Sequence, residues 1–455
     1  QIVSNIKYFK FFENYFLSPS LIFLFIILNL ISISFYNFFL ILGVNLIYLK
    51  ILSILLILIG FYRPFKFWKV ILNFSNRNKL FKIIIIIITG YFIISLLPIS
   101  DPDSLDYHIT VPYLSIINEE FFIQKEWLTS QLSGAGEALI MLGLSINAYK
   151  FSSILQFIAL ATIIFSILNL KNNKIIFNSD GKFLVCLAIL CIPSFLFLIF
   201  TAKPQLFSIT SNFIAFLITF FILPYENKKS RLIIIFSIIV FLCLSSTQFK
   251  FSFFLSSGII ILFATVDMIK KKYFLYSCLI ILFFSLLIIL PREYYDYNYL
   301  SQNILNNFFS PLANEYISDT FVTSLRNGVG NPRYLPYWLF VPFNSNTFDF
   351  SSITQIVGIS VLLFIINFKF KLIKKIFLAS LIFFVFAIPF GQSTGRFFIE
   401  PFLWLLVGSL YYIYANHNLY LKFFKNFILL NSFAIIIAIT ITIYNFIPGI
   451  LSVDQ

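Results

Sequence analysis

The sequence predicts an all-α fold, a polytopic bundle of transmembrane helices with about 11–13 spans. Of the 455 residues, 60% are hydrophobic and only 11% are charged, whereas a soluble protein of this length would be about a quarter charged. Apolar runs such as 82–97 and 183–200 are continuous, unlike the alternating strands of a membrane barrel. Because backbone amides in hydrocarbon must be paired within their own segment, we expect helices, in a single integral membrane domain over 1–455.

Hydropathy places the expected spans along the whole chain. They lie near 20–37, 42–62, 82–98, 150–169, 183–201, 204–223, 232–248, 251–267, 274–291, 353–367, 376–391, 397–415 and 427–446. Most of the 32 lysines and arginines occupy alternate connections, including 63–82, 171–182, 228–231, 270–272 and 369–375. Lysine and arginine are enriched in cytoplasmic connections, so these connections and the amino terminus are predicted to be cytoplasmic.

The net charge of +14 does not indicate a nucleic-acid partner. The basic residues are divided among many connections instead of forming one basic face, so we expect no nucleic acid and membrane lipids as the surroundings. The cysteines lie inside apolar runs and have neither metal-ligand nor disulfide spacing: Cys186, Cys191, Cys243 and Cys278.

Two predicted outer loops are long, and long loops are often functional. The first covers 99–149 and the second 292–352. In the first loop, 109–124 carries apolar residues at helical spacing, which predicts a helix lying in the membrane interface. These residues are Val111, Leu114, Ile117 and Phe121. The second loop is rich in tyrosine, which is typical of an interfacial aromatic belt.

Acidic residues gather on the predicted outer side, most densely at the start of the first loop. Asp101, Asp103 and Asp106 stand close together in the run that ends at Tyr107 and His108. Such carboxylates repel one another, so the cluster binds a cation, accepts protons or is simply well solvated. His108, one of two histidines, is a candidate acid–base group, metal ligand, substrate contact or ordinary hydrogen-bonding residue.

Basic residues are scarce on the predicted outer side, and several of them lie at the ends of spans. They are Lys203, Lys250, Arg292 and Arg396. In one interpretation each side chain extends to the lipid head groups. In the other, several converge on a phosphate or diphosphate, each charge-assisted hydrogen bond contributing about 1.5–3 kcal/mol.

Three short motifs resemble those of the GT-C superfamily of multispanning glycosyltransferases. Asp103-Ser-Leu-Asp-Tyr-His108 is similar to the Asp-x-Leu-x-Tyr-His signature of the first large outer loop. Lys203-Pro-Gln205 corresponds to a Lys-Pro-Asp element, from which Gln205 departs, and Arg396-Phe-Phe-Ile-Glu-Pro401 to an Arg-(aromatic)-x-x-x-Pro element. In order and spacing the resemblance covers about 90–415.

The resemblance implies a sugar donor attached to a polyprenyl phosphate or diphosphate, and a glycan, lipid or protein acceptor. It also implies the plasma (inner) membrane of a prokaryote, with the site facing the periplasm or exterior beneath the first loop. The sequence shows no Gly-x-Gly-x-x-Gly after a strand, which agrees with a donor that is not a nucleotide sugar.

Residue roles follow from the resemblance. Asp103 is the first candidate for the general base, Asp106 the second and Asp101 the third. The expected substrate contacts are Tyr107, His108, Glu137, Lys203, Lys250 and Arg396, of which the lysines and the arginine would bind phosphate. A divalent metal held by Asp101 and Asp103 is compatible with the spacing but not required by it.

Alternative functions remain open at this point. A transporter or flippase would place charges near the bilayer midplane, whereas the charges here lie almost entirely at helix ends. A polysaccharide polymerase or ligase would use the same lipid-linked sugars but rely on outer arginine and histidine more than on a carboxylate loop. An assembly subunit without catalysis is the third alternative.

Overall fold

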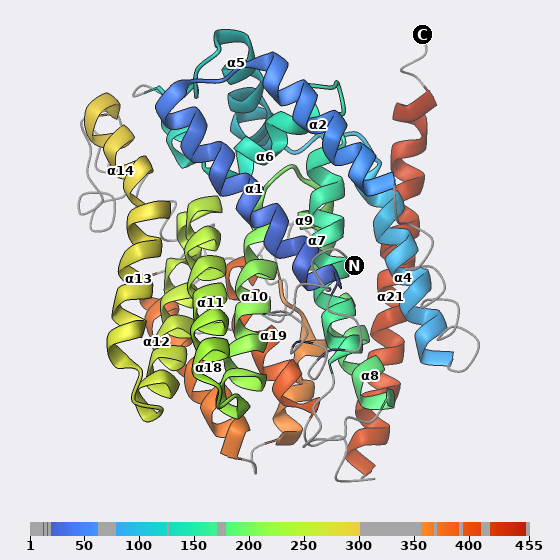
Figure 1. The fold of residues 1–455 in the computed structure, drawn as a ribbon. Helices are drawn as coiled ribbons and strands as arrows, with labels where there is room; N and C mark the ends of the chain where they lie inside the picture. The colour runs from blue at the N-terminus through green and yellow to red at the C-terminus, as the bar shows by residue number, and fades with distance from the viewer. Residues whose placement is uncertain are drawn as a thin grey trace.

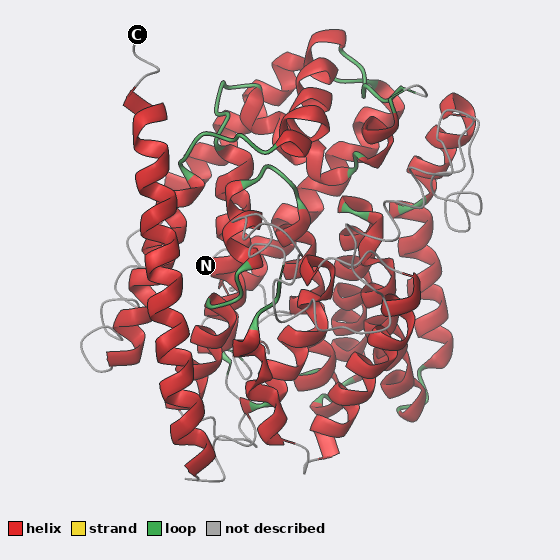
Figure 2. Ribbon diagram, turned by 180° about the vertical axis from the view of Figure 1, so that it is seen from behind, coloured by secondary structure: helices red, strands yellow, loops and turns green. Residues whose placement is uncertain are grey.

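The computed structural model describes residues 20–61, 79–124, 127–170, 179–300, 356–367, 371–390, 395–410 and 419–451, together with Phe12 and Phe16. Over these residues the chain is helical, and the only strand-like pairing is an isolated bridge between Phe16 and Leu170. Figure 2 shows helices joined by short loops throughout the described part. The all-α prediction is confirmed.

The helices cluster in one bundle with a cap of short helices at one end (Figure 1). In chain order the α-helices are α1 (Ser20–Leu42), α2 (Leu46–Phe61), α4 (Lys79–Ser95), α5 (Thr110–Asn118), α6 (Ala135–Leu144), α7 (Phe151–Asn169), α8 (Ser179–Leu190), α9 (Ser194–Phe200), α10 (Gln205–Phe221), α11 (Lys229–Phe249), α12 (Phe254–Lys270), α13 (Phe274–Ile288), α14 (Leu290–Tyr295), α18 (Lys371–Phe390), α19 (Ile399–Gly408) and α21 (Leu419–Leu451).

Six helices of the described part are long and apolar enough to cross a membrane, or up to eight if each of two bent pairs is one span. The six are Ile22–Leu42, Phe151–Asn169, Gln205–Tyr225, Lys229–Phe249, Phe251–Lys270 and Lys422–Phe446. Such helices are what an integral membrane protein requires. The number is lower than the about 11–13 spans predicted, because several predicted spans are shorter than expected, broken, or partly outside the described residues.

Proline accounts for two of the broken spans. The predicted span 183–201 divides into α8 and α9 at Pro193, with a bend of 68°. The predicted span 274–291 ends at Ile288, and α14, with Pro291 in its first turn, turns away by 43°. Proline removes a backbone donor and clashes with the preceding turn, so a helix bends or ends there.

The predicted span 353–367 is wrong in its described part. Residues Ile359–Asn367 form a 3₁₀ helix of 9 residues, which follows Gly358 at a positive φ of 79°. At about 2 Å per residue this segment is too short to cross a hydrocarbon layer of about 30 Å. The predicted span 397–415 is described as α19 over its first part only.

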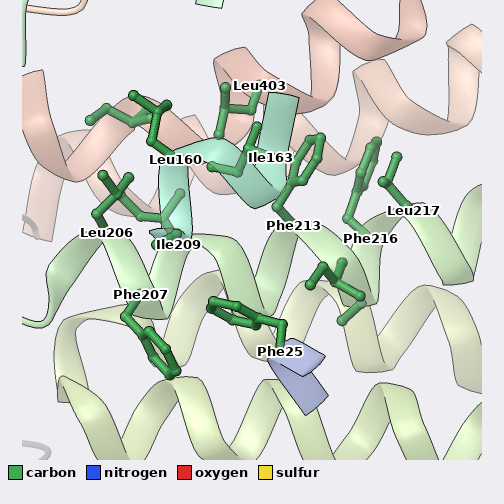
Figure 3. Packing of buried hydrophobic residues seen from close by; sticks show 14 of the residues in the cluster. Phe25, Leu160, Ile163, Leu206, Phe207, Ile209, Phe213, Phe216, Leu217 and Leu403 are labelled. Atoms are coloured by element: carbon green, nitrogen blue, oxygen red, sulfur yellow. The ribbon is translucent and has the colours of Figure 1, made fainter. Parts of the chain in front are cut away.

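Helix α10 forms the centre of the bundle, and every residue of it is buried. Figure 3 shows Leu206, Ile209 and Phe213 of α10 facing Leu160 and Ile163 of α7. On its other sides α10 packs against α1, α11, α12 and α19. The ring of Phe216 in α10 stacks on Trp404 of α19, with the centroids 5.6 Å apart.

The connections fall at opposite ends of the bundle. Figure 1 shows α5, α6 and α14 at one end, which we call the α5–α6 end, and the α12–α13 turn at the other. At that other end Lys271 donates hydrogen bonds to the backbone carbonyls of Pro224 and Glu226. The predicted division of the connections between two sides agrees with this arrangement, and the assignment of the basic side to the cytoplasm stays a prediction.

The first long loop is a compact helical cap. A π-helical turn, Ser104–Ile109, leads directly into α5, and a 3₁₀ turn, Leu128–Leu132, precedes the buried α6. The predicted helix within 109–124 is therefore present as α5, which ends at Glu119 in a left-handed conformation. The second long loop, predicted over 292–352, lies outside the described residues beyond its first nine positions.

Glycine allows this cap to approach the bundle closely. A Cβ atom on Gly134 would lie 2.1 Å from the carbonyl oxygen of Gln248, and one on Gly136 would lie 2.4 Å from Pro204. Both contacts place the start of α6 against the turns that carry Lys203 and Lys250. The absence of a side chain at these positions therefore determines how near Glu137 comes to the two lysines.

Gly134→Ala should destabilise the protein by about 1–3 kcal/mol, because the new methyl group meets backbone that cannot easily move. Gly258→Ala is the matched control, since a Cβ atom there has nothing within 4 Å and alanine favours a helix. Thermal unfolding of the purified variants in one detergent measures the difference. Equal unfolding temperatures for the two variants would contradict the packing at Gly134.

Candidate functional site

Ser104 connects the acidic run to the turn between α9 and α10. Its backbone amide and its hydroxyl both donate to Oδ2 of Asp101, at 2.9 and 2.7 Å. The same hydroxyl accepts a hydrogen bond of 3.0 Å from the backbone amide of Ala202. The serine thereby fixes the acidic run beside the residue that follows Ala202, which is Lys203.

Lys203 pairs with two of the three aspartates. Its Nζ lies 2.7 Å from Oδ2 of Asp103 and 3.2 Å from Oδ2 of Asp101. Lys203 is only 2% exposed, whereas Asp103 is 59% exposed. Burial acts to raise the pKa of Asp103, but the hydrogen bond and charge of Lys203, with Arg396 and Lys250, hold that pKa below its usual value. The pair is therefore a buried ammonium covered by an ionised, accessible carboxylate.

Two phenylalanine rings link the three predicted phosphate-binding cations. The ring of Phe197 has Nζ of Lys203 at 4.7 Å and Cζ of Arg396 at 5.4 Å from its centroid. The ring of Phe397 has Cζ of Arg396 at 5.3 Å and Nζ of Lys250 at 5.9 Å. Such cation–π contacts stabilise positive groups that are removed from water. Lys203, Arg396 and Lys250 thus form one connected cationic cluster.

The cations of this cluster act on one another. Burial and the positive charges of Arg396 and Lys203 lower the pKa of Lys250 to about 7, against the opposite effect of nearby carboxylates. Burial also lowers the pKa of Arg396. Gln205, which replaces the expected Asp, donates from Nε2 to the carbonyl oxygen of Arg396 at 3.3 Å and adds no negative charge. An anion bound among these cations would therefore reduce their mutual repulsion.

His108 and Glu137 form a buried pair beside the cluster. Nδ1 of His108 lies 2.5 Å from Oε1 of Glu137, and the two side chains are 2% and 0% exposed. Nε2 of His108 is buried and has no hydrogen-bond partner among the described residues. Burial, followed by the charges of Lys250, Lys203 and Arg396, lowers the pKa of His108 well below its usual value. Burial raises the pKa of Glu137 to about 7, although backbone hydrogen bonds oppose this rise.

Glu137 is positioned by the start of α6. The backbone amide of Gly134 donates to Oε2 of Glu137 at 2.6 Å, which is the reciprocal contact of a helix-capping glutamate. That leaves Oε1 directed to His108. The segment before α6 is held by Arg292, which donates to the carbonyl oxygens of Gln131 and Ser133.

Arg292 is therefore not part of the cationic cluster. Besides the first loop, it binds Asp296 at 2.7 Å and the hydroxyl of Tyr36 at 2.6 Å. These contacts join α14, α1 and the segment before α6. Among the basic residues at the predicted outer ends of spans, Arg292 therefore has a structural role. The other three, Lys203, Lys250 and Arg396, form the cationic cluster.

Asp106 and Tyr107 do not contact Lys203 as Asp101 and Asp103 do. Asp106 accepts hydrogen bonds from the Thr129 hydroxyl at 2.6 Å and from Nε1 of Trp127 at 3.3 Å, within the first loop. Tyr107 is buried against His108, with ring centroids 3.9 Å apart. The structure therefore brings Asp101 and Asp103 onto Lys203, while Asp106 turns toward the loop.

Some residues of the site were not predicted from the sequence. Ser104 lies within the recognised motif, but its link to Ala202 depends on folding. Phe197 and Phe397 are two of 63 phenylalanines, and only the adjacency of Phe397 to Arg396 offered a signal. Among the described residues, no group of three or more His, Cys, Asp and Glu side chains is placed to hold a metal ion. The two aspartates suggested for a metal are turned to Lys203.

Comparison with known proteins gives one match. No curated protein and no solved structure matches this chain. The family described as the DUF1420 N-terminal domain matches residues 58–455, which include every residue of the site described above. The chain therefore belongs to the DUF1420 N-terminal domain family.

Proposed function

We propose that this protein is a glycosyltransferase that moves a sugar from a polyprenyl-phosphate donor to an acceptor hydroxyl at the outer face of a membrane. The observation that carries the proposal is the contact of Asp103 with Lys203, at 2.7 Å, within a cluster that Lys250 and Arg396 complete. The acidic motif and the two basic motifs on which the resemblance to the GT-C superfamily rests thus lie in one site.

The cluster is suited to a phosphate. Three cationic side chains lie together, and burial with the charges of Arg396 and Lys203 lowers the pKa of Lys250, so a bound anion would relieve their mutual repulsion. Lys203 is buried, and charge-assisted hydrogen bonds to phosphate are strong when the donors are removed from water. The surrounding apolar helices provide the environment in which a polyprenyl chain would dissolve.

Donor binding would change the partner of Lys203. The carboxylate of Asp103 is exposed and could give up the ammonium to a phosphate oxygen, which has the same charge sign and similar geometry. Asp101 would remain, because Ser104 also holds it. In this proposal Asp101 keeps Lys203 in place, and Asp103 becomes free as the phosphate arrives.

The main electrostatic role in the reaction is to stabilise the negative charge that develops on the leaving phosphate, and the cations perform it. The acceptor oxygen forms a bond to the anomeric carbon as the bond from that carbon to the phosphate oxygen breaks. The electron pair stays on the phosphate, whose added negative charge Lys203, Arg396 and Lys250 stabilise. The acceptor proton passes to a base, for which the sequence hypothesis names Asp103 first and Asp106 second.

Lys203→Ala should raise the donor concentration needed for half-maximal transfer by roughly 10–100-fold, since one charge-assisted hydrogen bond is lost. The full-length protein in lipid nanodiscs would be given polyprenyl phosphate carrying radiolabelled glucose, mannose, galactose, N-acetylglucosamine or arabinose, with a membrane lipid extract as acceptor. Release of polyprenyl phosphate and movement of the label into a new product are measured.

Lys203→Arg should retain part of the donor affinity, and Lys422→Ala is a control at an exposed lysine far along the chain. A donor dependence that is the same for wild type and Lys203→Ala would contradict the phosphate role. Products that carry long chains of the labelled sugar would indicate a polymerase instead of a transferase of single sugars.

The affinity for the donor should fall as the pH rises through about 7, because burial and the neighbouring cations lower the pKa of Lys250 to that value. Below this pH the side chain is charged and attracts phosphate, whereas above it the charge is lost. The phosphodiester of the donor does not itself titrate in this range. The effect should be about tenfold between pH 6 and pH 9, the contribution of one such contact.

Lys250→Arg is the matched variant for this measurement, because arginine keeps its charge throughout the range. The variant should bind the donor with little dependence on pH, as measured by the KM for the donor at each pH. The assignment fails if wild type and Lys250→Arg lose affinity in parallel.

A further inference from the structure

The geometry points to the buried pair His108–Glu137, and not to the aspartates, as the group that takes the proton of the acceptor hydroxyl, at Nε2 of His108. This inference rests on the proposed sugar transfer. It assigns the base of that reaction to a histidine whose partner, Glu137, lies in a different helix of the first loop.

The contacts of Glu137 define which nitrogen is available. Oε2 accepts the backbone amide of Gly134 at 2.6 Å, so this carboxylate is held in one orientation at the start of α6. Oε1 lies 2.5 Å from Nδ1 of His108. With the glutamate ionised, Nδ1 carries the hydrogen and Nε2 carries a free electron pair. Nε2 is also the atom of the pair that has no partner among the described residues.

The charges around the pair favour that form. Lys250, Lys203 and Arg396 face His108, and Lys250 and Arg292 face Glu137. The ring of Tyr107 packs against the imidazole ring at an angle of 37°. A pair with one net negative charge is stabilised by these cations, whereas a lone imidazolium among them is not. An imidazole that carries its hydrogen on Nδ1 cannot donate from Nε2, so a partner at Nε2 must itself be a donor, such as a hydroxyl.

Asp103 is less suited to the same task. Lys203 holds it at 2.7 Å, and the surrounding cations keep its pKa below the usual value, which makes it a weak proton acceptor. Glu137 lies in the opposite environment, where burial raises the pKa to about 7. The structure therefore contains one carboxylate that stabilises a lysine and another that supports a histidine.

The step is balanced without a further reactant. The O–H bond of the acceptor breaks and a bond between Nε2 and that hydrogen forms, while the acceptor oxygen bonds to the anomeric carbon and the phosphate departs with its electron pair. The imidazolium formed is stabilised by the Glu137 carboxylate on Nδ1. The proton then leaves to solvent, and the pair regains its single negative charge.

Kinetics of the full-length protein test the assignment. His108→Gln and Glu137→Gln should each lower kcat by roughly 100-fold or more, the usual contribution of a general base, with a smaller change in the KM for the donor. In wild type, kcat should rise as the pH increases through about 7, and in Glu137→Gln this rise should move to lower pH. In Asp103→Asn, the rise of kcat with pH should stay near its wild-type position. Glu120→Gln makes the same kind of substitution at an exposed glutamate of the same loop and should behave as wild type.

The protonation of the pair can be observed without turnover, because the chain has only two histidines. In protein labelled with ¹⁵N-histidine, His417→Gln leaves the signal of His108 alone. We expect the Nδ1-protonated neutral form at pH 8, and a change in the His108 signal as the pH falls through about 7, where Glu137 takes up a proton. Glu137→Gln should abolish the preference for the Nδ1 form.

The outcomes separate this inference from the proposed function. If wild type transfers sugar while His108→Gln keeps its kcat, or if Asp103→Asn alone removes the dependence on pH, the pair is not the base and the transferase proposal stands. If His108 is protonated at Nε2 at pH 8, the geometry inferred for the pair is wrong. If wild type transfers no sugar from any of the donors, the proposed function and the base assignment fail together.

Discussion

A buried ammonium has to be paired, and in this protein that constraint joins the first loop to the bundle. Lys203 is 2% exposed, and removing a lysine charge from water costs several kcal/mol unless partners compensate. Asp101 and Asp103 supply the partners, and both belong to the acidic run at the start of the loop. The loop must therefore fold onto the turn between α9 and α10. The π-helical turn, α5 and α6 come after the acidic run in the chain, so their positions depend on this contact.

The basic residues at the predicted outer ends of spans have different roles in the folded protein. Arg292 binds Asp296, Tyr36 and two carbonyl oxygens, so its charge is paired and its hydrogen bonds join α14, α1 and the first loop. Lys250 and Arg396 instead contact aromatic rings and lie near other cations. Protein partners satisfy the first kind of cation, whereas the second kind remains available to an anionic ligand.

Hydropathy predicted the all-helical class, because helices in an apolar setting depend on the composition of their own segment. It did not predict the bend at Pro193 or the 3₁₀ helix at Ile359–Asn367, which depend on local backbone chemistry within an equally apolar run. In the site, the motifs predicted that Asp103 and Lys203 would serve one substrate, but their direct ion pair was not predicted. The pairing of His108 with Glu137 was not predicted either, because it depends on how the first loop folds to bring the turn Ser104–Ile109 beside the start of α6.

In the proposed reaction, the negative charge of the donor phosphate would offset the repulsion within the cationic cluster. Lys203, Arg396 and Lys250 are linked by two aromatic rings, and burial together with their mutual repulsion lowers the pKa of Lys250 to about 7. A bound phosphodiester removes that repulsion and restores the lysine charge, and it competes with Asp103 for Lys203. An uncharged molecule can do neither. The arrangement therefore favours an anionic donor, and in this proposal the acceptor hydroxyl meets Nε2 of His108, a buried nitrogen that has no hydrogen-bond partner among the described residues.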